Sequence, residues 1–452
     1  MIQKIAKQCV RMVQRYLPEP FIFAILLTFL VFVLAIPVGR QTPLEVLENW
    51  GNGIWSLLAF SMQMALVLVC GNTLADAPSV KKGLQKLAAL PRTPVSAIAL
   101  VTIVSSIACW INWGFGLIVG VIFAKEIARK LDGVDYRLLI ASAYSGFVVW
   151  HGGLSASIPL VLATPGKALS EATMGVVTEA IPISQTILAL PNILISLAVI
   201  VGLTIVNAMM HPRAKDEVVV IDRKLLYEHD DVVTTSSKTP AERLESSRIL
   251  ALLTAAMGIS FLVYKLIVKG NSLDLNSVIM LFLFLGIILH KTPIAYVRSL
   301  NKAAQSSAGI MLQFPFYAGI MGIMTGVSAD GTSLAGVISE ACVSMSNANT
   351  FPMVTFLSAG IMNIFVPSGG GQWAVQAPIM MPAGLELGVS PALTGMAIAW
   401  GDAWTNLIQP FWALPALAIA KLDAKDIMGF CVVNLIVTGL VICIGLTLWS
   451  FL

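Results

Sequence analysis

The residues best suited to chemistry in this chain are polar, and they interrupt four otherwise apolar segments. We call these interruptions breaks 1 to 4; they are residues 112–116, 151–157, 367–371 and 401–406. Each break frees backbone N–H groups at the start of a half-helix, and such N-termini favour anions. Glycine in the breaks lets the backbone approach a ligand closely. The breaks therefore predict an anion-binding site.

The side chains of the breaks indicate the kind of anion. No Lys or Arg lies in any break, whereas a phosphate or dianion usually recruits one. A small monoanion fits better, held by backbone dipoles, hydroxyls and amides and aided by a bound cation. The expected substrate-binding residues are Asn112, Gly114, Gly116, Ser155, Ser157, Asn363, Ser368, Gly369, Gly370, Thr405 and Asn406.

Aromatic residues surround the breaks and would suit a short apolar tail on the anion. Trp150 and Trp404 are expected to line the cavity, although ordinary helix packing is the plainer explanation for the aromatic set. Gln63 and Gln313 lie mid-span in matching segments and fit either cavity lining or helix–helix packing. The full aromatic set is Trp113, Phe115, Trp150, Trp373, Trp404, Phe411 and Trp412.

Asp402 is the only acidic residue placed deep within an apolar segment. An ionisable residue inside a membrane is a functional candidate by default. We expect Asp402 to bind the coupling ion, either a proton or Na⁺; the alternative is a structural carboxylate hydrogen-bonded to free amides. His151, in the matching break, has no second metal ligand beside it and is expected to be a hydrogen-bonding partner that lines the cavity.

The segments that carry the breaks are predicted to span a membrane. The chain has 452 residues, of which 57% are hydrophobic and 12% charged, against about 25% charged in soluble domains. Apolar runs such as 21–37, 247–268 and 430–452 are long enough to cross a bilayer. The net charge of +4 does not indicate nucleic acid binding, because basic residues cluster beside apolar segments as orientation signals. The six cysteines form no C-x-x-C pair and fit small core positions.

Charge clusters predict the topology. The apolar stretch 94–123 lies between two basic clusters, residues 81–92 and 125–137. A single crossing cannot join two loops on the same side, so this stretch is expected to form a re-entrant hairpin with its tip near 112–116. Such a backbone is tolerated only where protein or water buries it. A second hairpin, with its tip near 367–371, has acidic flanks and is expected to open outward.

The two halves of the chain carry the same residue types at matching positions. Trp150 recurs as Trp400 and Gln63 as Gln313, and both halves carry interruptions at matching positions, which point to a binding site near the bilayer midplane. Matched motifs fall on opposite sides of the membrane, so the halves are predicted to be inverted repeats. The predicted fold is an all-α polytopic membrane protein with about nine transmembrane spans and two re-entrant hairpins.

The same pattern divides the chain into five parts. Residues 1–17 form a basic amphipathic helix, with Ile5, Cys9, Met12 and Tyr16 on its apolar face; it suits the anionic cytoplasmic leaflet or a partner protein. The N-terminus is expected in the cytoplasm and the C-terminus in the periplasm. The other parts are the first repeat (18–210), a cytoplasmic linker (211–247), a connecting transmembrane helix (248–268) and the second repeat (269–452).

Four stretches resemble the bacterial short-chain fatty acid transporter family: ACWINWGFG at 108–116, QFPFYAG at 313–319, VPSGGG at 366–371 and QPFWALPALAI at 409–419. The resemblance covers nearly the whole chain and implies uptake of acetoacetate, butyrate and similar monocarboxylates across the inner membrane. The family is similar in plan to a larger group of carboxylate carriers with paired hairpins, an elevator mechanism and often a homodimer. Sodium-coupled members of that group carry Ser-Asn-Thr at the hairpin tips, which is missing here, so Na⁺ and H⁺ both stay open.

The sequence thus predicts a secondary active transporter rather than an enzyme, with a monocarboxylate and membrane lipid as its partners. It needs no cofactor beyond a coupling Na⁺ or H⁺, and no Walker loop supplies ATP-driven pumping. Two alternatives remain: a carrier of the same fold for another carboxylate such as a dicarboxylate, and a passive facilitator or channel. An intramembrane enzyme would have only Asp402 and His151 as catalysts, and they form no recognisable catalytic motif.

Overall fold

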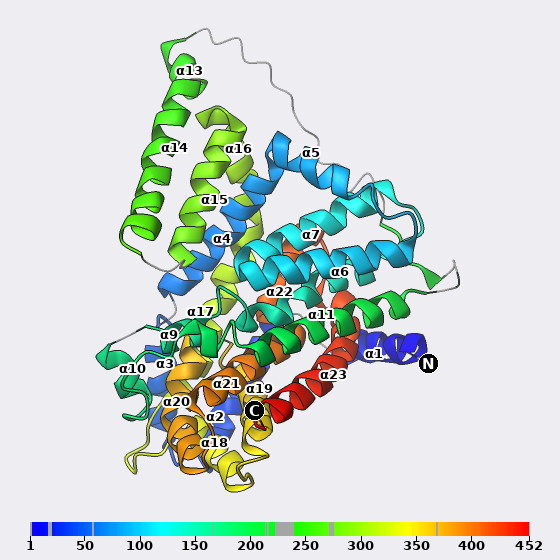
Figure 1. The fold of residues 1–452 in the computed structure, drawn as a ribbon. Coiled ribbons are helices and arrows are strands. Elements are labelled where there is room, and N and C mark those ends of the chain that lie inside the picture. The colour runs from blue at the N-terminus through cyan, green and yellow to red at the C-terminus, as the bar shows by residue number, and fades with distance from the viewer. Residues whose placement is uncertain are drawn as a thin grey trace.

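The molecule is built almost entirely from helices (Figure 1). The structure is a computed structural model that describes residues 2–16, 20–56, 58–164, 166–212, 214, 217–221, 239–270, 275–367 and 369–451. No strand occurs among these residues; their only extended pairing is an isolated bridge between Val327 and Ser333. The all-α prediction is confirmed.

Two successions of helices follow the same order. The first comprises α2 Pro20–Ala35, α3 Pro43–Gly53, α4 Leu58–Asp76, α5 Pro78–Leu87, α6 Pro94–Ile111, α7 Trp113–Lys130, α8 Tyr136–Ser145, η1 Gly146–Gly152, α9 Ser157–Leu162, α10 Lys167–Ala172, η2 Ile183–Gln185 and α11 Leu190–Met210. The second comprises α15 Leu275–His290, α16 Pro293–Ala304, η5 Gln305–Ser307, α17 Ala308–Thr325, α18 Leu334–Ser344, α19 Phe351–Phe365, α20 Gly369–Glu386, α21 Pro391–Thr405, η6 Asn406–Ile408, α22 Pro410–Ala420 and α23 Ala424–Trp449. Between them lie α13 Pro240–Glu245, α14 Arg248–Val263 and the π-turn η4 Tyr264–Val268.

The packing of the two successions is that of inverted repeats. Helix α3 packs on α17, and its counterpart α16 packs on α4; likewise α2 packs on α17 and α15 on α4. Matched elements also lie at opposite ends of the molecule, with α16 and α5 toward the top of Figure 1 and α3 and α18 toward the bottom. Exchange of partners between repeats is what a two-fold relation predicts, so each repeat completes the other.

Local sequence explains where the matched helices begin. Thr42 caps α3 by accepting from the Glu45 N–H at 3.3 Å, and the Glu45 carboxylate accepts from the Thr42 N–H at 2.6 Å. Thr292 caps α16 by accepting from the Ala295 N–H at 3.4 Å. Proline follows at the first position of both helices, where its fixed backbone angle suits a helix start.

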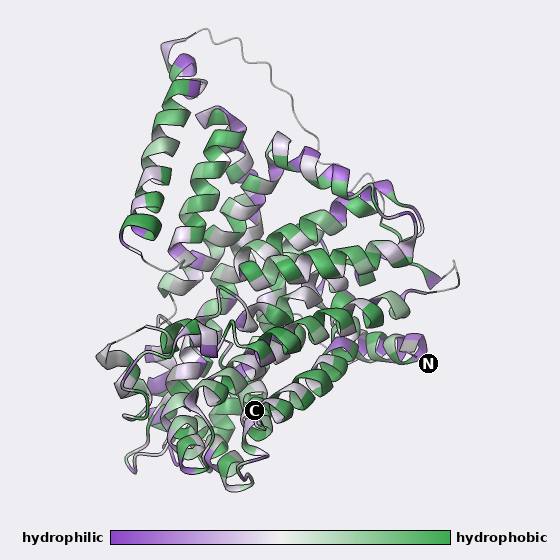
Figure 2. Cartoon of the chain, in the orientation of Figure 1, coloured by the Kyte–Doolittle hydropathy of each residue, from purple (hydrophilic) through white to green (hydrophobic). Residues whose placement is uncertain are grey.

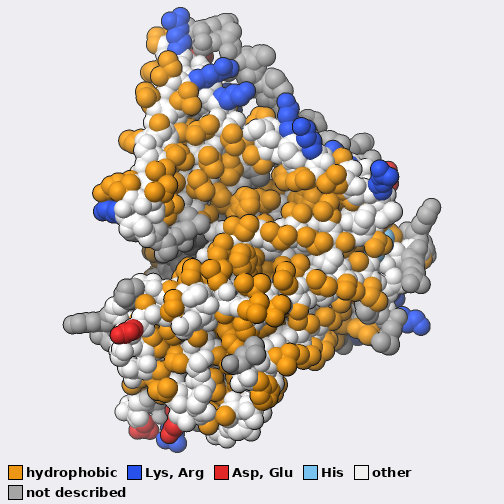
Figure 3. Space-filling view, in the orientation of Figure 1, with side chains coloured by type: hydrophobic (Ala, Val, Ile, Leu, Met, Phe, Trp, Pro, Cys, Tyr) orange, Lys and Arg blue, Asp and Glu red, His pale blue; other side chains and the backbone are white. Residues whose placement is uncertain are grey.

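The described helices fit a membrane. Five segments are long and apolar enough to cross one: 94–111, 136–162, 190–210, 248–268 and 424–449. Shorter apolar helices lie between them, and hydrophobic residues dominate the helices in Figure 2. Figure 3 shows Lys and Arg gathered along the upper edge and Asp and Glu mostly at the lower end. The chain is a multi-pass membrane protein.

The N-terminal helix α1, Ile2–Tyr16, packs on α23 and α11. Its buried residues are Ala6, Val10 and Val13, while Ile5 and Met12 stay exposed. The expected apolar face is therefore not the face that packs on the protein, because close packing against the Gly429 backbone selects Val10. Ile5 and Met12 remain free to meet lipid. Most of the 211–247 linker lies outside the described residues.

Candidate functional site

Break 1 is the turn of a tight antiparallel hairpin between α6 and α7. Asn112 alone separates the two helices, and its Oδ1 accepts from the Phe115 N–H at 3.0 Å. A Cβ on Gly116 would lie 2.2 Å from the Cys109 backbone nitrogen, so only glycine allows this approach. Gly114 is buried in the first turn of α7. The Asn112 side-chain oxygen is therefore engaged in capping rather than directed toward a ligand.

Break 2 joins the hairpin tip. The Trp113 N–H donates to Ser155 Oγ at 2.9 Å, and the Leu154 N–H donates to the Trp110 carbonyl at 2.7 Å. A Cβ on Gly153 would lie 2.0 Å from that same carbonyl oxygen. The structure therefore brings breaks 1 and 2 into direct contact.

Break 2 also meets break 4 through a buried polar chain. His151 Nδ1 lies 2.8 Å from Asp402 Oδ2, and His151 Nε2 lies 2.9 Å from Ser157 Oγ. The exposed fractions of the His151 and Asp402 side chains are 0% and 1%. A Cβ on Gly369, the first residue of α20, would lie 2.2 Å from Ser157 Oγ. Residues of breaks 2, 3 and 4 thus lie side by side.

The remaining predicted residues of break 4 bind α19. Asn363 Nδ2 donates to Thr405 Oγ1 at 3.0 Å and to Asn406 Oδ1 at 2.6 Å. Thr405 Oγ1 donates to the Gly360 carbonyl at 2.8 Å. These three residues form a separate network that holds α19 to the end of α21. A Cβ on Gly370 would meet no atom within 4 Å, and Ser368 lies outside the described residues.

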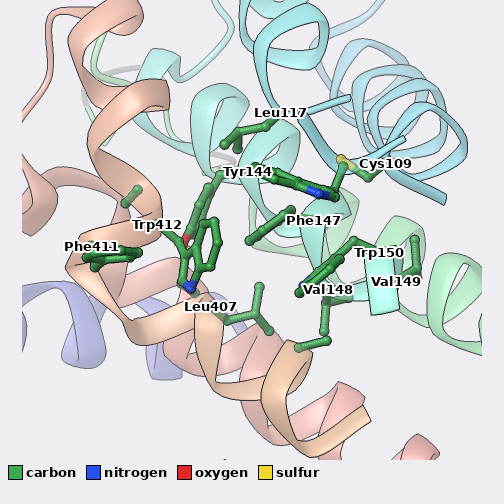
Figure 4. Close-up of a cluster of buried hydrophobic side chains, with 14 of the residues drawn as sticks. Cys109, Leu117, Tyr144, Phe147, Val148, Val149, Trp150, Leu407, Phe411 and Trp412 are labelled. Carbon is green, nitrogen blue, oxygen red and sulfur yellow. The ribbon is translucent and has the colours of Figure 1, made fainter. Parts of the chain in front are cut away.

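Aromatic side chains adjoin the polar chain. Trp113, Phe147, Trp150 and Trp412 have ring centroids 5.4–6.3 Å apart, and Figure 4 shows Phe147, Trp150 and Trp412 within one cluster of buried hydrophobic side chains. Trp150 stacks on His151 with centroids 3.9 Å apart. We call these four residues the aromatic cluster.

Two residues expected in the cavity, Gln63 and Trp404, lie elsewhere. Trp404 packs on Phe356, and its Nε1 donates to the Leu435 carbonyl at 2.7 Å, so it faces α23. Gln63 donates to Asn276 Oδ1 at 2.8 Å and joins α4 to α15. Gln313 is buried in α17. For Gln63 and Trp404 the structure shows helix packing.

Several buried polar atoms near the breaks have no hydrogen-bond partner within the described part of the chain: Asp402 Oδ1, Asn363 Oδ1, Asn406 Nδ2 and Trp150 Nε1. A buried polar atom without a partner is costly. Each is therefore a candidate contact for a substrate, an ion or water. No group of three or more His, Cys, Asp and Glu side chains among the described residues could hold a metal ion.

Two residues that the sequence argument missed position the breaks. Asn192 on α11 accepts from Trp400 Nε1 at 3.0 Å and donates to the Gly152 carbonyl at 2.8 Å. The Tyr144 hydroxyl donates to the Asn406 carbonyl. A buried amide inside the apolar run of α11 was the available signal for Asn192, since such a group needs a partner.

A second polar region lies at the other end of α7, in a cavity of about 620 Å³. We call it the basic cavity. Asp76 and Lys81 form an ion pair at 2.5 Å, and Glu126 pairs with Arg129. Its charged lining residues are Asp76, Lys81, Lys125, Glu126, Arg129, Lys130, Lys302 and Lys421.

The cavity holds Asp76 in its ionised form. Burial by itself raises the pKa of this carboxyl, but hydrogen bonds from Lys81 and Ser299 and the charges of Lys81 and Lys302 lower the pKa below its ordinary value. The cavity is therefore a site of fixed charges with an excess of positive ones.

Comparison with known proteins identifies the family. The model of the short-chain fatty acid transporter family matches residues 1–449. The chain belongs to this family. The predicted resemblance is confirmed, and with it a membrane transporter of a small carboxylate rather than an enzyme.

Two curated relatives carry provisional names as short-chain fatty acid transporters. The relative from Escherichia coli (strain K12) is 47% identical over 451 residues, covering 99% of this chain and 100% of the relative. The relative from Haemophilus influenzae is 44% identical over 450 residues, covering 99% of both chains. The crystal structure of the Alcanivorax borkumensis YdaH transporter is similar with a TM-score of 0.48 and 15% identity, covering 96% of this chain and 98% of that one.

Proposed function

We propose that this protein is a secondary active transporter that takes up acetoacetate, butyrate and similar monocarboxylates across the bacterial inner membrane. A gradient of Na⁺ or H⁺ drives it, through elevator-like alternating access in a homodimer. The N-terminus faces the cytoplasm and the C-terminus the periplasm. The observation that carries the proposal is the meeting of breaks 1, 2 and 4 with the start of α20 in one buried region without Lys or Arg.

The chemistry of that region fits a short monocarboxylate. In the first turn of α7 the Trp113 and Phe115 N–H groups are already bound by Ser155 Oγ and Asn112 Oδ1, so we assign the anionic head to the first turn of α20. The aromatic cluster lies next to His151 and offers apolar surface for a tail of a few carbons. A dicarboxylate would place its second charge against these rings without a cationic partner. We therefore expect succinate to compete poorly.

The basic cavity supports the proposed orientation of the protein in the membrane. It opens between α4, α5 and α16 on one side and α7 and α22 on the other. Basic residues mark the cytoplasmic side of membrane proteins, so we assign the cavity as the cytoplasmic mouth. One wall is formed by α7 of the hairpin and by α22, which follows break 4. The facing wall is formed by α4, α5 and α16. In an elevator mechanism, this boundary is where one group of helices would slide past the other.

The test is uptake of labelled acetoacetate and butyrate by right-side-out vesicles, with matched vesicles lacking the protein subtracted for diffusion of the neutral acids. We expect accumulation above equilibrium under a Na⁺ or a H⁺ gradient, and weak competition by succinate. Protein-dependent flux that only equilibrates would indicate a channel. Absence of protein-dependent uptake under both gradients would overturn the proposal.

A further inference from the structure

We propose that His151 and Asp402 form the proton-binding site that couples substrate uptake to the proton gradient, with Ser157 positioning the imidazole. This inference rests on the proposed transport function and names its coupling ion. The pair joins η1 of the first repeat to α21 of the second through a 2.8 Å hydrogen bond. A change in its protonation state therefore alters a contact between the two halves of the molecule.

The hydrogen bonds assign the proton positions. His151 Nε2 accepts from the Ile158 N–H at 3.2 Å and lies 2.9 Å from Ser157 Oγ. A nitrogen that accepts carries no hydrogen, so the imidazole proton resides on Nδ1 and is donated to Asp402 Oδ2. In this state the pair holds one proton and one negative charge.

The site is poised to accept one further proton. Asp402 Oδ1 is buried and has no hydrogen-bond partner among the described residues. A buried carboxylate that is not fully paired is costly in a low-dielectric interior. Protonation of Oδ1 neutralises the pair and turns the oxygen into a donor, leaving the His151 hydrogen bond intact. The proton moves from water to Oδ1 without any bond to carbon forming or breaking.

A proton suits this site better than Na⁺. A hard cation requires several oxygen ligands, whereas the atom facing the Asp402 carboxylate is an imidazole N–H. Ser157 Oγ points at the opposite side of the same ring. The described residues also place no second acidic side chain in hydrogen-bond contact with Asp402.

The elements that pack around the pair carry other ionisable groups. η1 packs on α6, α7, α8, α9, α11 and η6, and α21 packs on α19, α20, α9, α23, η6 and η1. Among the described residues, the hydrogen bonds and ion pairs of His151 and Asp402 involve none of these groups. Those groups are Lys125, Glu126, Arg129, Lys130, Arg137, Glu386, Lys425 and Asp426 at helix ends, with Cys109, Tyr136, Tyr144, Cys431 and Cys443.

Electrostatic repulsion couples protonation of the pair to binding of the substrate anion. Gly369 opens α20 directly against Ser157 and the His151 ring, so an anion bound at the start of α20 lies beside the pair. Two like charges repel strongly where water is excluded. The substrate therefore binds the protonated pair, and by reciprocity bound substrate favours proton uptake. Carboxylate and proton then cross together without net charge.

The first experiment compares the wild type with Asp402→Asn in proteoliposomes. For the wild type we expect acetoacetate to accumulate about tenfold per unit of an inside-alkaline pH gradient, the limit for one proton per substrate. Asp402→Asn mimics the protonated carboxyl and keeps an oxygen for His151 Nδ1. After subtraction of matched liposomes without protein, which report diffusion of the neutral acid, it should lose accumulation but retain exchange of labelled for unlabelled acetoacetate. Glu386→Gln, which neutralises a carboxylate at the far end of α20 in the same repeat, should accumulate as the wild type does.

A second measurement needs no variant. Calorimetric titration of the wild type with acetoacetate, in buffers of different ionisation enthalpy, should show uptake of about one proton per bound substrate at neutral pH. Binding without proton uptake overturns the inference, as does wild-type accumulation that follows Na⁺ and ignores pH. Unimpaired accumulation by Asp402→Asn would make the pair structural. Wild-type protein that exchanges no acetoacetate would instead refute the proposed function.

Discussion

The region where the breaks meet and the basic cavity lie toward opposite ends of α7, an 18-residue helix about 27 Å long. Among the described residues of the four breaks, the first contains one carboxylate, paired with an imidazole and shielded from solvent. The second contains six basic and two acidic side chains around about 620 Å³ of accessible space. One helix therefore connects a charge-poor region to a charge-rich one.

The difference follows from the cost of burying charge. In a buried region an unpaired cation would bind any anion too firmly or destabilise the fold, so recognition passes to backbone N–H groups, hydroxyls and ring faces. In an open cavity water screens each Lys, and several can gather at little cost. We infer that the buried region selects the substrate, while the basic cavity attracts anions without choosing among them.

The largest effect should come from adding one methyl group at the buried region. A Cβ on Gly369 would lie 2.2 Å from Ser157 Oγ and 2.8 Å from His151 Cε1, whereas a Cβ on Gly370 meets nothing within 4 Å. Overpacking of this kind costs about 1–3 kcal/mol. Gly369→Ala should therefore reduce the initial rate of acetoacetate exchange by roughly tenfold or more.

Gly51→Ala is the control, since it makes the same change at a helical glycine of α3, outside the breaks, where a Cβ also meets nothing within 4 Å. It should exchange acetoacetate at close to the wild-type rate, with both variants purified in equal yield. Equal rates for Gly369→Ala and the wild type would show that contact between α20 and break 2 is dispensable. That result would contradict the inference that the buried region selects the substrate.

A smaller effect is expected from neutralising the basic cavity. Lys125→Gln combined with Lys421→Asn removes two lining charges, and asparagine suits the left-handed backbone of Lys421, whose φ is 54°. Electrostatic steering accelerates association and weakens with salt. Efflux from the cytoplasmic side at low ionic strength should slow by about tenfold at most, with flatter salt dependence.

Lys425→Gln provides the control for charge, because Lys425 lies outside the cavity lining and is an exposed neighbour of Asp423. Its efflux should keep the wild-type salt dependence. A change in substrate preference between acetoacetate and succinate in the cavity variant would contradict the division of roles. That outcome would place selectivity in the cavity instead.

Sequence alone predicted the elements well, for physical reasons. Apolar runs of sufficient length and basic clusters beside them constrain how a chain can cross a bilayer. The expected runs 21–37 and 247–268 coincide closely with α2 Pro20–Ala35 and with α14 and η4, Arg248–Val268. The position of Asn112 in a stretch between two basic clusters was enough to place the turn between α6 and α7. The packing face of α1 was not predictable, because Val10 packs against Gly429, a residue from the far end of the chain.

The candidate site was predicted in its residues but not in their partners. Glycine-rich breaks mark where backbone groups are free, yet the pattern does not say which break meets which. The pairing of His151 with Asp402 and the separate network of Asn363, Thr405 and Asn406 depend on how the two repeats are docked. The basic cavity escaped prediction because α5, α7, α16 and α22, with the Lys421 turn, converge there from distant parts of the sequence.

The smallest effect should come from Asp76→Asn, which alters the fixed charges of the basic cavity without touching the buried region. The pKa of Asp76 is lowered in the fold, despite its burial, by Lys81, Ser299 and Lys302. A carboxyl with a lowered folded pKa stabilises the protein above its unfolded pKa of about 3.9, and the contribution is lost as the pH falls through the folded value. The ion pair is partly exposed, so its loss should cost no more than about 1 kcal/mol. We expect the detergent-solubilised variant to melt about 1–4 °C below the wild type at neutral pH and level with it in acid. A difference in Tm that persisted in acid would show that the carboxylate charge is not what stabilises this end of the molecule, while unchanged acetoacetate exchange at neutral pH would keep the two regions separable.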